Sequence, residues 1–284
     1  MKWRKQMKPR TKQQAKKTKE DVKPWVAKFG RFGIMTRGAV YILVGIVTLM
    51  AALGIGGSTK GAQGAFSSVA SVPFGEVLLW VIGVGLICYI IWRILEFFTD
   101  PENQGEDVKG WLSRTGYIIS GLIHIGFASK AFMIANHAGK SGDAKEKWTA
   151  KVLSEPFGQW MIGLLGVIII GVGIHELYVA YTEKFVKRFN IAKMNPKEIR
   201  IGKLTGKIGI SARGIVICII GYFLIITAIT LDTDKAMGID EAIGKLASEP
   251  YGQWMLVAVA IGLFLYGIFE VIKGKNQHMG LKDF

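Results

Sequence analysis

The sequence has few of the residues that build disulfide frameworks, metal sites or enzyme centres. Its 284 residues include two cysteines, four histidines and seven prolines. Two isolated cysteines, Cys88 and Cys218, exclude a disulfide scaffold, and we expect both to behave as small hydrophobic residues. No glycine-rich phosphate loop, nucleophile elbow or dense His/Asp/Glu cluster is present. We therefore predict no enzymatic activity, no catalytic residue, no metal and no cofactor.

Long apolar runs are what the sequence does contain, since half of its residues are hydrophobic. Six uncharged runs cover residues 38–59, 77–92, 115–129, 156–174, 214–231 and 250–269. A membrane-spanning helix needs about 20 mostly apolar residues, and the alternation typical of barrel strands is absent. The shorter runs reach this length if Arg93, Glu96 and Lys130 lie at membrane interfaces. The sequence predicts an all-α integral membrane protein with six transmembrane helices.

Basic residues are concentrated in two segments. The chain has 36 Lys and Arg against 21 Asp and Glu, a net charge of +15. Residues 1–35 hold 12 of the cations, and residues 183–207, between the fourth and fifth runs, hold eight. By the positive-inside rule both segments, and both termini, are predicted to be cytoplasmic. We expect this basic face to contact membrane lipids with anionic headgroups, and we predict no nucleic-acid partner.

Two signatures recur three times along the chain. A proline, an aromatic residue and a glycine precede or open each even-numbered run, at Pro73, Pro156 and Pro250. Each odd-numbered run follows a basic-x-Gly-x-x-x-(Arg or Ser)-Gly pattern, whose seventh position is Arg37, Ser120 or Arg213. That position precedes the proline by 36, 36 and 37 residues. The chain is therefore predicted to be three copies of a two-helix hairpin in a pseudo-threefold arrangement, with a short surface helix between the spans of each hairpin.

These patterns divide the chain into hairpins and cytoplasmic segments. The predicted parts are a polybasic, disordered cytoplasmic tail (1–21), hairpin repeat 1 (22–99), hairpin repeat 2 (108–183), a basic cytoplasmic linker (184–200), hairpin repeat 3 (201–273) and a cytoplasmic tail (274–284).

The residues of the first hairpin resemble a known bacterial membrane family. The matching elements are Arg37-Gly-Ala-Val-Tyr-Ile-Leu-Val-Gly45, the Gly64-Ala65 segment before Pro73-Phe-Gly75, and the ending Gly85-Leu…Tyr89…Trp92-Arg93. This pattern resembles domain of unknown function 1206, and degenerate versions in the other hairpins extend it over about residues 25–273. The resemblance implies a six-span protein of the bacterial cytoplasmic membrane, and it implies no activity.

Charged residues inside the spans are the main candidates for a functional site, because charges in lipid are costly. Alignment at the prolines puts Arg93, Glu176 and Glu270 at equivalent positions, each 20 residues after its proline. Arg37 and Arg213 are predicted to lie at about the same cytoplasmic depth. Such a network could be a gate of ion pairs that opens during transport. The alternatives are a static lock between helices, or arginines that extend to the headgroups.

Two histidines fall within the spans, at His124 and His175. We predict both to be buried polar residues. Their predicted depths differ by several ångströms, which does not suit a shared haem or compact metal site. A hydrogen-bonded structural role is favoured for His124.

Two functions remain open at this point. The first is a non-enzymatic membrane scaffold or lipid-associated protein of unknown biochemical activity. The second is a small-solute or ion carrier or channel, whose central pathway is gated by the charge network. A homo-oligomer or a protein partner is left open.

Overall fold

The computed structural model describes residues 9–99, 108–137, 157–230, 251–277 and 279, and its described residues are almost entirely helical. The long helices are α1 (Pro9–Ala52), α3 (Gly75–Thr99), α4 (Val108–Ala135), α6 (Gly158–Tyr181), α7 (Pro196–Thr230) and α9 (Gly252–Asn276). A short helix, α2 (Gly61–Ala70), follows α1, and two 3-10 turns, η2 (Lys184–Arg188) and η3 (Ile191–Lys193), link α6 to α7. Six of these helices are long and apolar enough to cross a membrane, which confirms the predicted all-α membrane fold.

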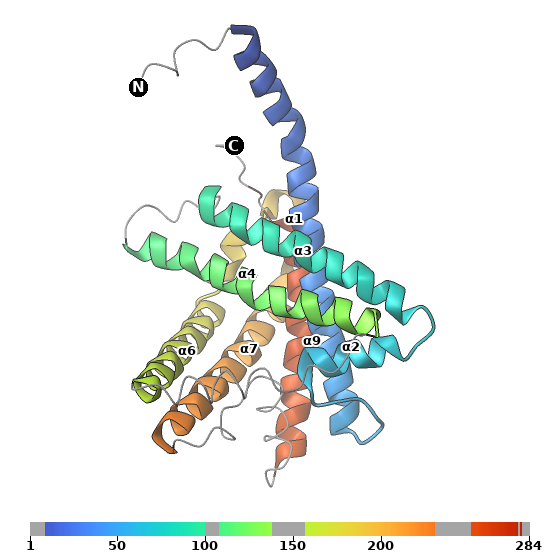
Figure 1. The fold of residues 1–284 in the computed structure, drawn as a ribbon, viewed down its shortest axis with the longest axis vertical. Coiled ribbons are helices and arrows are strands. Elements are labelled where there is room, and N and C mark those ends of the chain that lie inside the picture. Colours follow the sequence, from blue (N-terminus) through green and yellow to red (C-terminus); the bar gives the residue numbers. More distant parts are fainter. Residues whose placement is uncertain (1–8, 100–107, 138–156, 231–250, 278, 280–284) are drawn as a thin grey trace.

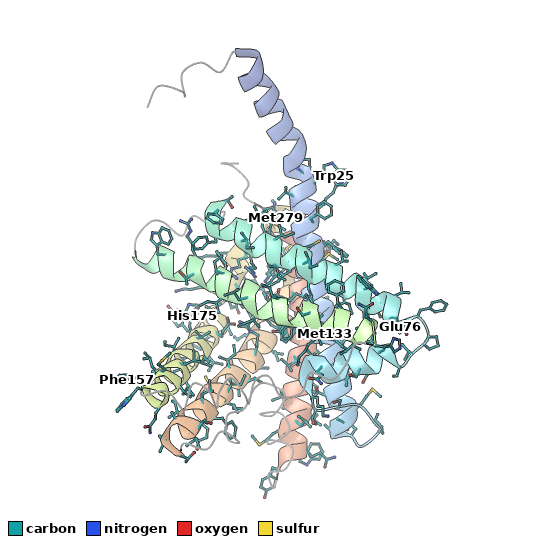
Figure 2. The ribbon with its side chains drawn as sticks, viewed as in Figure 1. Trp25, Glu76, Met133, Phe157, His175 and Met279 are labelled. Atoms are coloured by element: carbon teal, nitrogen blue, oxygen red, sulfur yellow. The ribbon has the colours of Figure 1, made fainter. Side chains whose placement is uncertain are left out.

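The helices run alternately up and down (Figure 1). The start of α1, the end of α9, and the linker between α6 and α7 lie at one end of the molecule, and α2 lies towards the other. Helices α3 and α4 lie side by side and run mainly across this view, whereas α1 and α9 run along its long axis. Figure 2 places Trp25 and Met279 at the first end, away from Glu76 and Phe157.

Each odd-numbered span packs against an even-numbered span of another hairpin. The pairs are α1 with α9, α4 with α3, and α7 with α6. In two pairs the backbones meet at glycines: a Cβ on Gly267 would lie 2.6 Å from the carbonyl oxygen of Gly38, and one on Gly221 would lie 2.7 Å from that of Gly166. Small residues allow this approach, which matters in lipid because burial of apolar surface between helices gains little there.

In the middle hairpin, α4 and α6 do not make the close glycine contact that joins the two spans of each of the other hairpins; we call this hairpin open. A Cβ on Gly33 would lie 2.3 Å from the backbone nitrogen of Tyr89, and one on Gly209 would lie 2.4 Å from that of Tyr266. The equivalent Gly116 of α4 has no described atom within 4 Å of such a Cβ. On α6, the position equivalent to the two tyrosines is Val172, which is 47% exposed. Because the hairpins differ in this way, the pseudo-threefold arrangement stays a prediction.

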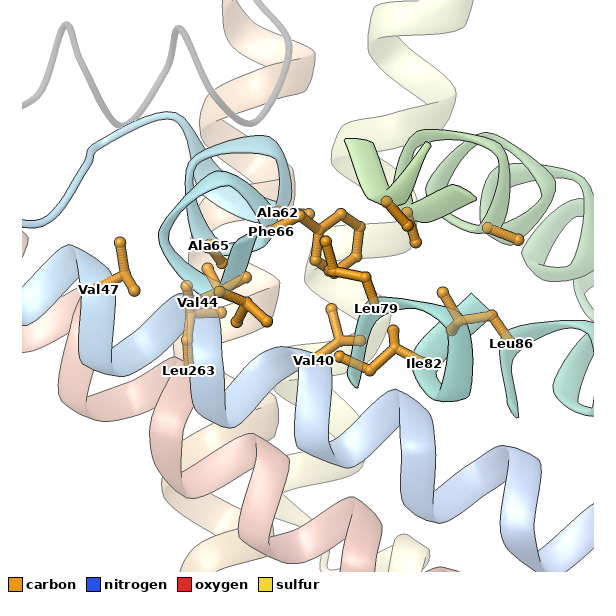
Figure 3. Packing of buried hydrophobic residues seen from close by; sticks show 14 of the residues in the cluster. Val40, Val44, Val47, Ala62, Ala65, Phe66, Leu79, Ile82, Leu86 and Leu263 are labelled. Atoms are coloured by element: carbon orange, nitrogen blue, oxygen red, sulfur yellow. The ribbon is translucent and has the colours of Figure 1, made fainter. Parts of the chain in front are cut away.

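The main apolar core lies around α2. The side chains of Ala65, Phe66, Leu79 and Leu86 are fully buried, and residues of α1, α4 and α9 pack around them (Figure 3). The helix that we predicted on the outer surface of the first hairpin is therefore packed into the core. Its apolar face, with Phe66 at the centre, favours burial over a surface position. The corresponding segments of the other hairpins lie outside the described residues.

The tail predicted to be disordered is helical from Pro9 onwards, since α1 begins there. Residues 11–20 are mostly Lys, Gln, Ala and Glu, which have high helix propensity, and they continue directly into the first span. High charge alone therefore misled the prediction for residues 9–21. Residues 1–8 and 280–284 lie outside the described residues.

The open middle hairpin predicts opposite effects for two equivalent glycine substitutions. We expect Gly209→Ala to lower the free energy of unfolding by about 1–3 kcal/mol, because its Cβ would meet the backbone of Tyr266. Gly116→Ala is expected to leave it unchanged or raise it by up to about 1 kcal/mol, because alanine favours the helix. Unfolding of both variants in detergent, followed by circular dichroism, measures this. Equal destabilisation by the two substitutions would show that α4 and α6 pack closely.

Candidate functional site

Arg37 of α1 forms the centre of a buried network of charges. Its Nη1 donates to Oε2 of Glu270 on α9 at 3.0 Å, and its Nη2 donates to the hydroxyl of Tyr266 at 2.8 Å. Lys273, less than one turn further along α9, donates to the other carboxylate oxygen of Glu270 at 2.5 Å. Residues three and four apart share a face of a helix, so Tyr266, Glu270 and Lys273 all point towards α1. Glu270 therefore accepts hydrogen bonds from two cations.

Arg213 of α7 reaches the same tyrosine from the other side. Its Nη1 donates to the hydroxyl of Tyr266 at 3.1 Å, and its Nη2 donates to Oε1 of Glu176 on α6 at 2.5 Å. The guanidinium groups of Arg37 and Arg213 also lie over the Tyr266 ring, at 5.5 and 5.0 Å from its centroid. Tyr266 thus connects two ion pairs that belong to different helix pairs.

In the third helix pair, α3 with α4, the arginine lies on the even-numbered span and not on the odd-numbered one. Position seven of the repeat is Ser120 on α4, and its hydroxyl shares a hydrogen bond of 2.9 Å with Tyr89 of α3. Arg93, on α3, donates from Nε to the Tyr89 hydroxyl at 2.7 Å and from Nη1 to Glu96 at 2.5 Å. The guanidinium of Arg37 lies 5.2 Å from the Tyr89 ring centroid, which joins this cluster to the first.

The structure therefore brings all five predicted charged residues into one network. They are Arg37, Arg93, Glu176, Arg213 and Glu270. As expected from the lack of an arginine at position seven of the middle hairpin, Glu176 pairs with an arginine of a different hairpin. Glu96, which we placed at a membrane interface, is instead fully buried beside Arg93, and Gln277 donates to its second oxygen at 3.3 Å.

Two tyrosines at the centre of the network were not predicted from the sequence. Tyr89 and Tyr266 each lie 16 residues after the proline of their repeat, four residues before the charged position. Four residues is about one helical turn, so tyrosine and charge share a face. A comparison of the repeats one turn before the charged position would have identified both tyrosines. The repeat alignment contains no pattern that points to Lys273.

The ion pairs differ in their exposure. The side chains of Arg37 and Glu270 are 5% and 1% exposed, whereas those of Arg213 and Glu176 are 19% and 22% exposed. The Arg213–Glu176 pair lies at the contact of α6 and α7, next to the open middle hairpin. Like charges gathered in a buried setting repel one another strongly, so the arginines depend on these carboxylates.

His124 is buried and has a structural setting. Its Nδ1 lies 2.7 Å from the backbone oxygen of Ser120, and its ring packs 4.6 Å from the Tyr89 ring. Tyr41, which occupies the same repeat position, packs edge-on with its ring centroid 4.7 Å from that of Tyr266. His124 therefore takes the place of a packing tyrosine.

The prediction that His175 is buried is wrong, because its side chain is exposed on α6. The face of α6 that packs against α7 carries Gly166 and Gly173, and residue 175 lies about 200° around the helix from residue 173. Among the described residues no group of three or more His, Cys, Asp or Glu is placed to hold a metal ion.

The buried position of Glu270 predicts a large effect of its neutralisation. Glu270→Gln leaves Arg37 and Lys273 without their carboxylate, and loss of one partner from a buried pair costs about 3–5 kcal/mol. We expect this loss in the unfolding free energy measured by titration with sodium dodecyl sulfate. The control is Glu198→Gln, which breaks an exposed pair with Lys275 and should change stability little. Similar stability of the two variants would contradict a stabilising role for the network.

The comparisons with known proteins match this architecture. One family model, described as Domain of Unknown Function (DUF1206), matches three times, at residues 32–100, 115–183 and 208–277. The chain is also 40% identical over 263 residues to the uncharacterized protein YxxB of Bacillus subtilis strain 168, covering 93% of this chain and 95% of that relative. No solved structure matches the chain. The three matches confirm the predicted resemblance and its repeats, and the chain belongs to the DUF1206 family.

Proposed function

We propose that the protein is a non-enzymatic, lipid-associated scaffold of the bacterial cytoplasmic membrane, with both termini in the cytoplasm. The observation that carries this proposal is the use of the intramembrane charges. Arg37, Arg93 and Arg213 each pair with a carboxylate of the same protein, and two of these pairs join different helices. Charges used in this way stabilise the packing of the helices.

The packing beneath the network supports the same function. The core cluster around Phe66 includes buried residues of α1, α2, α3, α4, α7 and α9. Side chains such as Val44, Leu86 and Leu263 fill the region where these helices meet (Figure 3). A tightly packed apolar interior of this kind favours a static role over a solute pathway.

Aromatic residues at the two ends of the spans support their placement across a bilayer. The aromatic residue of each proline elbow is exposed, at Phe74, Phe157 and Tyr251. At the other end of α6, Lys184 lies 4.4 Å from the ring centroid of Tyr178. Residues 157 and 178 are separated by about 32 Å along a helix, which matches a hydrocarbon core of about 30 Å. Aromatic residues favour such interfaces.

An ordered basic surface is suited to anionic headgroups. The linker and the first turns of α7 carry exposed cations at Lys184, Lys187, Lys193, Lys197, Arg200, Lys203 and Lys207. The linker is held in place because Phe185 and Phe189 are buried against Phe269 of α9. Exposed Leu204 lies among the cations, so apolar and basic groups occur together, as at a headgroup boundary.

One observation favours the carrier alternative. The Arg213–Glu176 pair is partly exposed beside the open middle hairpin, where a solute could reach it. A carrier of this kind requires the pair to open while the buried Arg37–Glu270 pair holds the remaining helices.

A flux assay separates the two functions. We expect liposomes that contain the wild-type protein to take up labelled amino acids, sugars and inorganic ions at the rate of protein-free liposomes. Glu176→Gln should give the same background rate, because the carboxylate serves packing. Uptake above background that Glu176→Gln abolishes, while Glu198→Gln retains it, would favour the carrier.

The proposed orientation is tested by cysteine labelling of intact cells. In a Cys88→Ser, Cys218→Ser background, Tyr251→Cys places a thiol at a proline elbow that is 80% exposed, and Lys197→Cys places one on the basic surface. A membrane-impermeant maleimide should label position 251 in intact cells and position 197 only after permeabilisation. The opposite pattern would place the termini outside the cytoplasm.

A further inference from the structure

The buried network has one positive charge more than its carboxylates balance. Among the described residues, its cations are Arg37, Arg93, Arg213 and Lys273, and its carboxylates are Glu96, Glu176 and Glu270. Unbalanced charge is expensive in a buried setting, and an uncompensated ion is retained only where another group offsets it. Within the part of the chain that the structure describes, these ion pairs therefore carry one positive charge in excess.

The same region has an excess of hydrogen-bond donors around Tyr266. The Tyr266 hydroxyl accepts from both Arg37 and Arg213, and the described residues supply no acceptor for its own proton. The Nε atoms of Arg37 and Arg213 are buried without a hydrogen-bond partner among those residues. In a guanidinium group, Nε–H lies along the same edge as one terminal N–H. In Arg37 that edge includes Nη2, which donates to Tyr266, so the unused N–H lies beside the tyrosine.

A helix dipole or a water molecule would satisfy only part of this arrangement. Lys273 lies in the last turn of α9, where the negative end of the helix dipole offsets part of its charge. The dipole supplies no acceptor for the donors around Tyr266. A water molecule would accept hydrogen bonds but would leave the charge unbalanced. A bound anion supplies both the negative charge and an acceptor for the donors around Tyr266.

We propose that Arg37, Arg213 and Tyr266 form a binding site for a small monovalent inorganic anion of the chloride class. One negative charge balances the network, whereas a divalent anion would reverse the imbalance. The anion accepts hydrogen bonds from the Nε–H of Arg37 and from the Tyr266 hydroxyl, and the guanidinium of Arg213 lies beside them over the Tyr266 ring. Glu270 and Glu176 keep their pairs with the arginines. The partly exposed Arg213–Glu176 side gives it access.

Chloride binding to the purified full chain in detergent tests this site. Equilibrium dialysis with radioactive chloride measures binding, with gluconate maintaining the ionic strength. We expect saturable binding of about one chloride per chain. At roughly ten times Kd, the unfolding temperature should rise by about 3–6 °C relative to gluconate alone. Absence of saturable binding by the folded wild-type protein would overturn the proposal, and this result is independent of any transport.

Two variants assign the binding to this site. Arg37→Lys keeps the charge beside Glu270 but removes the Nε–H donor, and Lys273→Met removes the excess charge but keeps every donor around Tyr266. Each should weaken chloride binding by at least about tenfold, as expected for loss of a charge-assisted hydrogen bond or its balancing charge. Arg114→Lys and Lys275→Met are the matched controls and should bind as the wild type does. Unchanged binding in Arg37→Lys and Lys273→Met would overturn the assignment, and the wild-type measurement decides the proposal even if a variant does not fold.

Discussion

The hydroxyl of Tyr266 is the point on which the arrangement of helices depends. It accepts hydrogen bonds from Arg37 on α1 and Arg213 on α7, and so connects the α1–α9 pair to the α6–α7 pair. Helices in lipid gain little from burying apolar surface against one another, so close backbone contacts and polar interactions must hold them together. The glycines of α1 and α9 allow the close backbone contacts, and the arginine–tyrosine network supplies the polar interactions. The charge chemistry of this protein is therefore inseparable from its packing.

The three repeats keep one interface and vary its charges. In two helix pairs an arginine of the odd span faces a glutamate of the even span, as in Arg37–Glu270 and Arg213–Glu176. In the third, serine replaces that arginine, and Arg93 supplies the cation from the opposite helix. Position seven therefore keeps a polar contact across the helix pair in all three repeats of this chain, while the sign and origin of the charge change.

Much of the fold followed from the sequence because it depends on local patterns. Apolar length predicted six spans, and the recurrence of proline elbows and glycines predicted three hairpins. The charged positions could be aligned because residues equivalent in the repeat lie at similar depths. Lys273, Glu96 and the exposure of His175 could not be predicted, because they depend on which face of each helix meets which neighbour. The crossing of α3 and α4 over α1 and α9 and the burial of α2 likewise depend on side-chain packing between several helices, which the sequence of a single repeat does not contain.

The pairing of α1 with α9 has a consequence for how the chain matures. Ribosomes release the first span long before the last, and segments generally fold in the order in which they emerge. Because Glu270 follows Arg37 by 233 residues, Arg37 meets this carboxylate only after α9 has been made. The long side chain of arginine lets the guanidinium remain hydrated or held by headgroups during that interval. Pairing with α9 then buries the guanidinium and joins the first and last of the described helices.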